Sequence, residues 1–385
     1  MRRPLLALAT TLLAVLAACG SSGDGASTAP TSTGGASVSP SASSAPGSTV
    51  GATTAPTNAP TTTTRHPLAA DAFDATDARL DQRVAAAGTG AGMVRVVDAD
   101  GTLIHEHTVG GFSGATALSV ASSTKWLTAA TFMTFVDQGA IHLDDDIARW
   151  LPEFAGSTPP ITPRQLLSGT SGVHDNPCQN GGTALAACVR TLASSPREFA
   201  AGAQYSYGNS PFLVVGRLVE VLGQADFATV VQQRLTGPLA MSATVWPGAP
   251  DSANPAFGAQ ITVDDYGRFL DMILHDGVAH GTRVLSANAV SEILTNQVSA
   301  YDTSHDYSVG ITGIPRYGLG CWIDVPDANG RATVVSGSGG TGLYPWIDFT
   351  SRTYGVVGVQ DERGAEVAVP ASQQVEVLAR AAVDG

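Results

Sequence analysis

The sequence predicts an α+β fold in which the two ends of the folded chain complete one sheet. Apolar or alternating runs, typical of strands, lie near the start and near the end of this part of the chain. Helical patterns fill the region between them. A sheet flanked by helices, with an inserted and mostly helical lobe, buries all of these apolar faces.

The first elements are expected to be a helix, a hairpin and a second helix. Acidic residues come early in the first helical pattern, and the run DADG at residues 98–101 is typical of a hairpin turn. The predicted elements are a helix over 70–87, strands over 93–97 and 103–109, and a helix over 124–138 that ends at Gly139.

The middle of the chain has helical spacing and the last part returns to strands. The predicted helices are 164–168, 211–222, 227–235, 264–274 and 287–294. The predicted strands are 317–325, 332–336, 346–349 and 354–359, and a helix over 372–382 closes the chain.

The N-terminal residues are expected to direct and tether the protein. Residues 1–18 have the pattern of a signal peptide, and their end resembles a bacterial lipobox, which implies lipid on Cys19 and a membrane anchor. The alternative is an ordinary signal peptide with a chance cysteine. Residues 19–66 are rich in Ser, Thr, Ala, Gly and Pro, so they cannot bury enough surface to fold. Residues 67–385 are therefore the predicted folded domain, located outside the cytoplasm.

Charge and cysteine content narrow the function. The formal charge of −13 disfavours nucleic acid as a partner. Cys178 and Cys188 flank a Gly-containing loop, so a local disulfide is expected in an exported protein, whereas Cys321 is expected to be a buried thiol. Because histidines and cysteines do not cluster, no metal or other cofactor is expected.

The most informative residue is Lys125, the single lysine among 385 residues. Arginine replaces lysine where only charge is needed, but a catalytic amine must be able to lose its proton. Ser122 lies three residues earlier, on the same side of the predicted helix. This S-x-x-K run predicts a nucleophile and its base. The alternative is that Ser122 only caps the helix and Lys125 is exposed.

Two further runs could complete an active site. A phenol at Tyr207 near a lysine amine could be held ionised or exchange a proton with it, and the Asn209 amide could bond the lysine or a substrate. The Gly-rich run 336–342, after a predicted strand, would let a substrate approach the backbone closely. Taken alone, the tyrosine could instead be a packing residue and the run a flexible turn.

The order and spacing of these runs resemble the serine β-lactamase and penicillin-binding-protein-like hydrolases, in particular the class C β-lactamase, D-aminopeptidase and esterase branch. The resemblance covers residues 80–349 and includes the runs 121–125, 143–152, 166–172, 207–209 and 264–270. It implies a β-lactamase-like fold with an antiparallel sheet, and acyl transfer through a covalent intermediate.

The resemblance also implies a role for each candidate residue. Ser122 would attack a carbonyl, with Lys125 and Tyr207 sharing the base and acid duties as a coupled pair. Asn209 would orient Lys125 and the substrate. The backbone amides of Ser122 and Gly340 would form the oxyanion hole, and Ser338 and Gly339 would belong to the substrate-binding strand.

The third motif departs from the family. Relatives carry Lys or His, then Ser or Thr, then Gly, whereas this chain has Gly337-Ser338-Gly339 and no basic side chain. Arg316 or Arg331 could supply charge from elsewhere. An esterase or amidase acting on an uncharged group is therefore expected rather than an efficient β-lactamase. The expected partner is a small ester, amide or peptide, and the protein is expected to be a monomer. The alternatives are a catalytically weak or silent protein that binds cell-wall peptide fragments, and a true β-lactamase.

Overall fold

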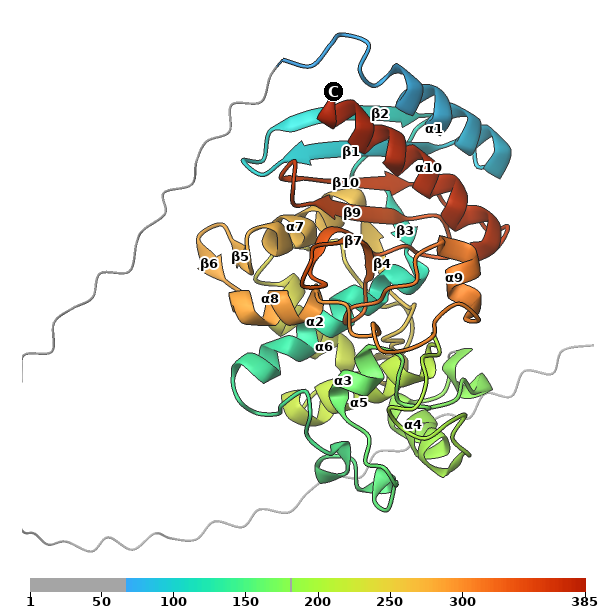
Figure 1. The fold of residues 1–385 in the computed structure, drawn as a ribbon, viewed down its shortest axis with the longest axis vertical. Helices are drawn as coiled ribbons and strands as arrows, with labels where there is room; N and C mark the ends of the chain where they lie inside the picture. Colours follow the sequence, from blue (N-terminus) through green and yellow to red (C-terminus); the bar gives the residue numbers. More distant parts are fainter. Residues whose placement is uncertain (1–66, 181) are drawn as a thin grey trace, which may run out of the picture. The chain divides into compact units, whose positions relative to one another are not determined.

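The computed structural model contains a six-stranded antiparallel sheet with strand order β2–β1–β10–β9–β8–β7, which lies in the upper half of the view in Figure 1. The structure describes residues 67–180 and 182–385, which belong to one compact unit. The predicted signal peptide, the lipid on Cys19 and the linker over residues 19–66 lie outside the described residues. Within the described part of the chain, no helix is both long and apolar enough to span a bilayer.

Both ends of the folded chain contribute to this sheet, as predicted. The strands are β1 (Gly92–Asp98), β2 (Leu103–Val109), β7 (Trp322–Pro326), β8 (Ala332–Ser336), β9 (Tyr344–Asp348) and β10 (Thr353–Gly358). β1 pairs with β10 in a register that sets Met93 opposite Gly358, so the N-terminal hairpin joins the C-terminal strands directly. The α+β architecture predicted from the sequence, with an antiparallel sheet completed by both ends of the folded chain, is confirmed.

Helices cover both faces of the sheet. α1 (Asp74–Ala87) and α10 (Ala365–Asp384) pack together on one face, where Leu80, Val94 and Val375 belong to one buried cluster. α7 (Val263–Leu274) packs on the opposite face against β9 and β10. Burying apolar side chains on both faces is the main term that holds such a layered fold together.

The inserted lobe is mostly helical. α2 (Thr124–Asp137) runs through its core and is buried on all sides from Thr124 to Phe135. The other lobe helices are α3 (Pro163–Leu167), α4 (Leu185–Ser194), α5 (Ser210–Gly223), α6 (Phe227–Val231), α8 (Ala287–Ile293) and α9 (Tyr307–Thr312). Two short ribbons add β3 (Ala117–Ser119) with β4 (Gln260–Thr262), and β5 (Val278–Ala279) with β6 (Thr282–Arg283). A disulfide joins Cys178 to Cys188.

Two predicted boundaries near the C-terminus were wrong. The strand predicted over 317–325 begins at Trp322, because Gly320 has a φ of +82° and a tight turn precedes the strand. The closing helix predicted over 372–382 begins at Ala365, with Pro370 inside it. Buried Ala368 and Val369 anchor the first turns against the sheet, so packing outweighs the low helix propensity of proline. Cys321 is a buried free thiol.

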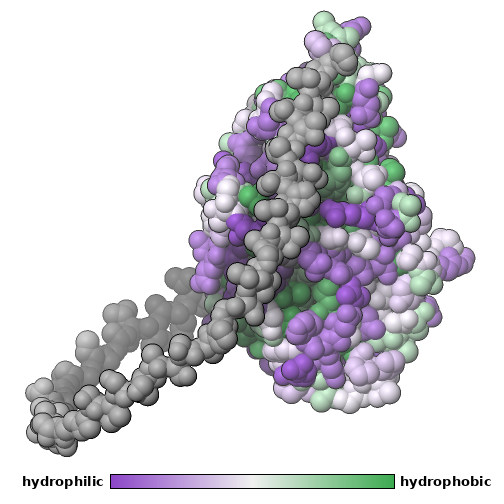
Figure 2. All heavy atoms as spheres, turned by 60° about the vertical axis from the view of Figure 1, so that its left-hand side comes forward, coloured by the Kyte–Doolittle hydropathy of each residue, from purple (hydrophilic) through white to green (hydrophobic). Residues whose placement is uncertain are grey.

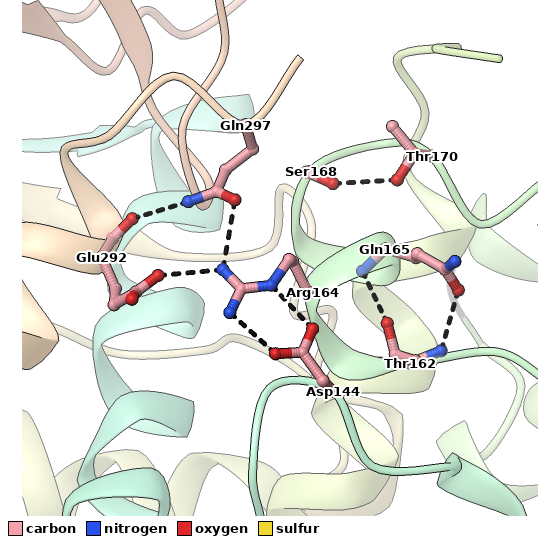
Figure 3. Close-up of polar contacts among 8 residues, drawn as sticks. All are labelled: Asp144, Thr162, Arg164, Gln165, Ser168, Thr170, Glu292 and Gln297. Atoms are coloured by element: carbon pink, nitrogen blue, oxygen red, sulfur yellow. Dashed lines mark hydrogen bonds and ion pairs between the residues drawn. The ribbon is translucent and has the colours of Figure 1, made fainter. Parts of the chain in front are cut away.

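A polar network joins three segments of the lobe (Figure 3). The Arg164 guanidinium on α3 donates to both oxygens of Asp144 at 2.8 and 3.0 Å, and to Glu292 at 2.9 Å. Its Nη1 also donates to Gln297 at 3.2 Å. Thr162 caps the same helix through a capping box with Gln165. The planar guanidinium thus ties α3 to the loop that carries Asp144 and to the end of α8.

We expect Arg164→Lys to lower the free energy of unfolding by about 1 kcal/mol, because an ammonium group cannot make the paired bonds to Asp144. Arg149→Lys is the matched control, since Arg149 is 64% exposed and pairs with a single carboxylate, Asp145. Urea unfolding of both variants measures the difference. Equal effects at the two positions would show that the paired geometry adds no stability.

Hydrophilic residues cover most of the face shown in Figure 2, and apolar residues show between them. The large apolar side chains that are exposed in the described chain are scattered: Leu103, Val245, Tyr307, Val325, Val367 and Val377. Isolated exposed apolar residues are ordinary at protein surfaces. Tyr307 differs from the others because its ring contacts Tyr207.

Candidate active site

A strained turn presents Ser122. The chain leaves β3, forms a 3₁₀ turn over Ala121–Ser123 and then enters α2. Ala121 has a φ of +44°, a conformation that L-residues rarely adopt and that the surrounding structure must enforce. Ser123, two residues further on, helps to do so, because its hydroxyl donates to the carbonyl of Gly337 and its own carbonyl accepts from the Tyr266 phenol at 2.9 Å.

The Lys125 amine lies beside Ser122, as predicted. Its Nζ is 3.1 Å from Ser122 Oγ, 2.6 Å from Asn209 Oδ1 and 3.2 Å from the carbonyl oxygen of Ala256. The side chain is fully buried, and its Nζ faces the ring of Tyr207 at 5.0 Å from the centroid. The prediction that Asn209 orients the lysine therefore has direct geometric support.

Burial controls the charge of this amine. It lowers the pKa of Lys125 to about 7, and the negative charge of Asp175 opposes part of this shift. An arginine in the same place would stay charged. At neutral pH a substantial fraction of Lys125 is thus an uncharged base within hydrogen-bonding distance of a hydroxyl.

Aromatic side chains hold the Tyr207 ring. It stacks on Trp322 at 5.1 Å between centroids, and the rings of Tyr317 and Tyr307 approach it edge-on at 5.7 and 6.0 Å. Burial raises the pKa of Tyr207 well above its usual range, and its hydrogen bond with Ser122 opposes this shift. The phenol is therefore protonated at neutral pH. Of the two predicted partners, Lys125 is the one suited to accept a proton and Tyr207 the one suited to donate it.

Two carboxylates that the sequence reasoning missed position the Tyr207–Asn209 segment. Asp175 Oδ1 accepts from the backbone amides of Asn209 and Ser210 at 2.9 and 2.8 Å. Asp306 Oδ2 accepts from the backbone amide of Tyr207 at 2.8 Å. Asp175 follows the family-like run 166–172 after only two residues, Val173 and His174. That position was a usable signal for Asp175. Asp306 gave none.

The third motif lies against the Ser122 turn. The amides of Gly337 and Gly339 donate to the carbonyls of Pro345 and Leu343 at 3.0 and 2.8 Å. A Cβ at Gly339 would lie 2.2 Å from the Val120 carbonyl oxygen. Glycine there allows the strand to approach the turn that carries Ser122. The amide of Gly339 already has a partner, so Gly340 remains the predicted oxyanion donor of this run.

No metal centre competes with this interpretation in the described residues. Among residues 67–180 and 182–385, no group of three or more His, Cys, Asp or Glu side chains is arranged to hold a metal ion. What the site does bring together is a hydroxyl, a buried amine, a protonated phenol and backbone amides. That set is suited to acyl transfer through a covalent serine intermediate.

Comparison with known proteins confirms the β-lactamase-like fold that the sequence predicted. The family model described as Beta-lactamase matches residues 77–379, so the chain belongs to the β-lactamase family. Penicillin-binding protein 4 of Amycolatopsis lactamdurans is 29% identical over 282 residues, which cover 60% of this chain and 73% of that protein. Esterase EstB of Burkholderia gladioli is 31% identical over 147 residues, covering 33% of this chain and 37% of the esterase.

A solved structure agrees with these relatives. A Bacteroides dorei protein named for the β-lactamase family is 28% identical and superposes with a TM-score of 0.71 over 79% of this chain and 98% of that one. The family includes proteins named as an esterase and as a penicillin-binding protein. Membership therefore gives the hydrolase family, and the bond that this protein cleaves is a separate question.

Proposed function

We propose that this protein is a serine hydrolase that cleaves an ester or amide bond through a covalent acyl-Ser122 intermediate. The observation that carries the proposal is the 3.1 Å distance between Ser122 Oγ and the Lys125 amine, whose pKa is lowered to about 7. A neutral amine at that distance can take the hydroxyl proton as the oxygen attacks.

The proposed reaction has two halves. In the first, the Ser122 oxygen bonds to the substrate carbonyl carbon while Lys125 accepts its proton, and the amides of Ser122 and Gly340 face the oxyanion. The bond to the leaving group then breaks, and Tyr207 gives its proton to that group. Lys125 then returns a proton to Tyr207. In the second half, a water oxygen bonds to the acyl carbon while Lys125 accepts its proton. The bond from that carbon to the Ser122 oxygen then breaks, Lys125 returns the proton to this oxygen, and the acid is released.

We also propose a cell-envelope setting, because residues 1–18 and Cys19 have the pattern of an export signal with a lipid anchor. An ester or amide is favoured over a β-lactam as substrate because the third motif carries no basic residue. A relative named as an esterase supports this choice, and one named as a penicillin-binding protein keeps peptide substrates in view.

A serine-reactive fluorophosphonate and the short acyl ester p-nitrophenyl butyrate test the proposal on the full chain. We expect the probe to add its mass to the peptide that carries Ser122, and ester turnover to disappear in Ser122→Ala. Ser194→Ala is the matched control, since Ser194 is exposed at the end of α4. A folded protein that is neither labelled nor active, but binds cell-wall peptides equally well with Ala at position 122, would select the silent binding protein instead. Turnover of a chromogenic cephalosporin at a rate matching the ester would select a true β-lactamase.

A further inference from the structure

Gly337 occupies the first position of the third motif, where relatives carry a basic side chain. Its φ lies outside the left-handed region, so the backbone there does not require glycine. Space does. A Cβ at Gly337 would lie 2.7 Å from Cε3 of Trp126, 3.3 Å from the Tyr266 phenol oxygen and 3.4 Å from Cγ of Pro345. Real Cβ atoms essentially never approach another atom as closely as 2.7 Å, so Trp126 excludes a side chain here.

Trp126 has little freedom to move aside. It is fully buried, and its ring meets Phe269 edge-on at 5.4 Å between centroids. Phe269 in turn contacts Tyr266, whose phenol donates to the carbonyl of Ser123. Trp126 also follows Lys125 directly on α2. Displacing this indole would therefore disturb the helix turn that holds the candidate base.

The arginines that could have supplied a cation are engaged elsewhere. Arg316 donates to the backbone carbonyls of Ile323 and Asp324, and Arg331 pairs with Asp276. The charges that do flank the Tyr207–Asn209 segment are the carboxylates of Asp175 and Asp306. A substrate carboxylate in the site would meet these negative charges and an amine that is only partly protonated.

We propose that Trp126 and Gly337 are a matched pair that determines specificity. The indole fills the space where a basic third-motif side chain would begin, and the site is thereby restricted to esters or amides whose acyl group carries no negative charge. This inference rests on the proposed serine hydrolase function and adds the class of substrate to it.

Two substrates that differ mainly in one charge test the restriction: p-nitrophenyl butyrate, with a neutral acyl chain, and p-nitrophenyl monosuccinate, with a carboxylate at its end. For the unaltered protein we expect kcat/KM for the butyrate to be at least about tenfold higher than kcat/KM for the monosuccinate. Equal values, after correction for the intrinsic reactivity of the two esters, would overturn the restriction.

Paired variants test the role of Trp126. Gly337→His alone is expected to lower the melting temperature by several degrees, with no gain toward the monosuccinate, because the imidazole has no room. Trp126→Thr combined with Gly337→His is expected to recover part of that stability and to shift the ratio of the two kcat/KM values toward the monosuccinate by about tenfold or more. A single Gly337→His variant with an unchanged melting temperature and improved monosuccinate turnover would overturn the proposal.

A milder pair keeps the steric claim testable if the histidine variants fail to fold. Gly337→Ala should lower the melting temperature, and Trp126→Thr should remove that penalty in a double-mutant cycle. Gly267→Ala is the control, because the nearest atom to its added Cβ is 3.6 Å away. Additive effects of Gly337→Ala and Trp126→Thr would overturn the matched pair. If the unaltered protein turns over neither ester, that result counts against the serine hydrolase proposal. The melting temperatures of the variants would still decide whether Trp126 and Gly337 are a matched pair.

Discussion

Lys125→Arg is expected to lower kcat/KM for an ester substrate by about 10³-fold or more, although it keeps a positive charge. The reason is that arginine does not release its proton at any pH at which the protein is folded, so it cannot accept the one from Ser122. It is also bulkier than the site around Asn209 and Ala256 allows, since both accept hydrogen bonds from the amine at short range. Steady-state kinetics with circular dichroism as a folding control measure the loss. Activity within tenfold of the unaltered protein would remove Lys125 from the role of base.

The same amine predicts how activity depends on pH. With a folded pKa of about 7, Lys125 is protonated and inactive as a base below that pH, so kcat/KM should rise as pH increases through about 7. This limb should be missing from the residual activity of Lys125→Arg.

The free energy of unfolding should depend on the same titration of Lys125. The unfolded amine keeps its proton up to about pH 10.4, so the unfolding free energy should increase with pH between about 7 and 10. Lys125→Met should remove that slope.

Asp361→Asn is expected to lower the free energy of unfolding by about 3–5 kcal/mol, the largest stability change that we predict. Asp361 and Arg83 are both fully buried and pair at 2.5 Å, linking α1 to the segment that follows β10. The variant would leave a buried guanidinium without its counter-charge. Urea unfolding measures the change, and Asp302→Asn, at an exposed carboxylate, is the control expected to leave the stability nearly unchanged. A loss below about 1 kcal/mol at Asp361 would show that water compensates for the missing charge.

This pair also reaches the candidate site. The backbone amide of Asp361 donates to the carbonyl of Thr341 at 2.7 Å, within the Gly-rich run that follows β8. Hydrogen bonds from Arg363, and then the charge of Arg83, hold the pKa of Asp361 well below its usual range. A carboxyl with a lowered folded pKa contributes stability that is present above the unfolded pKa near 4 and is lost as pH falls toward the folded value. Asp361→Asn should therefore flatten the acid limb of the stability curve.

The sequence predicted the elements whose signals are local. The hairpin from Met93 to Val109 and the helix after Ser122 follow from apolar spacing and turn residues within a short window, and both are present. Boundaries failed where packing overrides local preference, as at Pro370 inside α10. Helix α4 and the short helix α9 were not predicted, although α9 brings Tyr307 and Asp306 to the site.

The candidate site likewise has one part that local sequence predicts and another part that it does not. Ser122 and Lys125 are three residues apart, so the geometry of one helical turn nearly suffices to bring them together, and the single lysine marked them in the sequence. Tyr207 and Asn209 were candidates from their side-chain chemistry, but only the resemblance linked them to Ser122, because a separation of more than 80 residues carries no geometric information by itself. The folded chain then showed which of the coupled pair can accept a proton, since burial moves the two pKa values in opposite directions.

The sequence by itself determined the fold class, the S-x-x-K pair and the absence of a base in the third motif. Only the tertiary structure decided why that base is absent. Trp126 and Gly337 lie more than 200 positions apart in the chain, and their incompatibility with a third-motif side chain exists only once the first turn of α2 packs against the segment that follows β8. Composition and periodicity describe neighbours along the chain, whereas excluded volume and desolvation depend on neighbours in space.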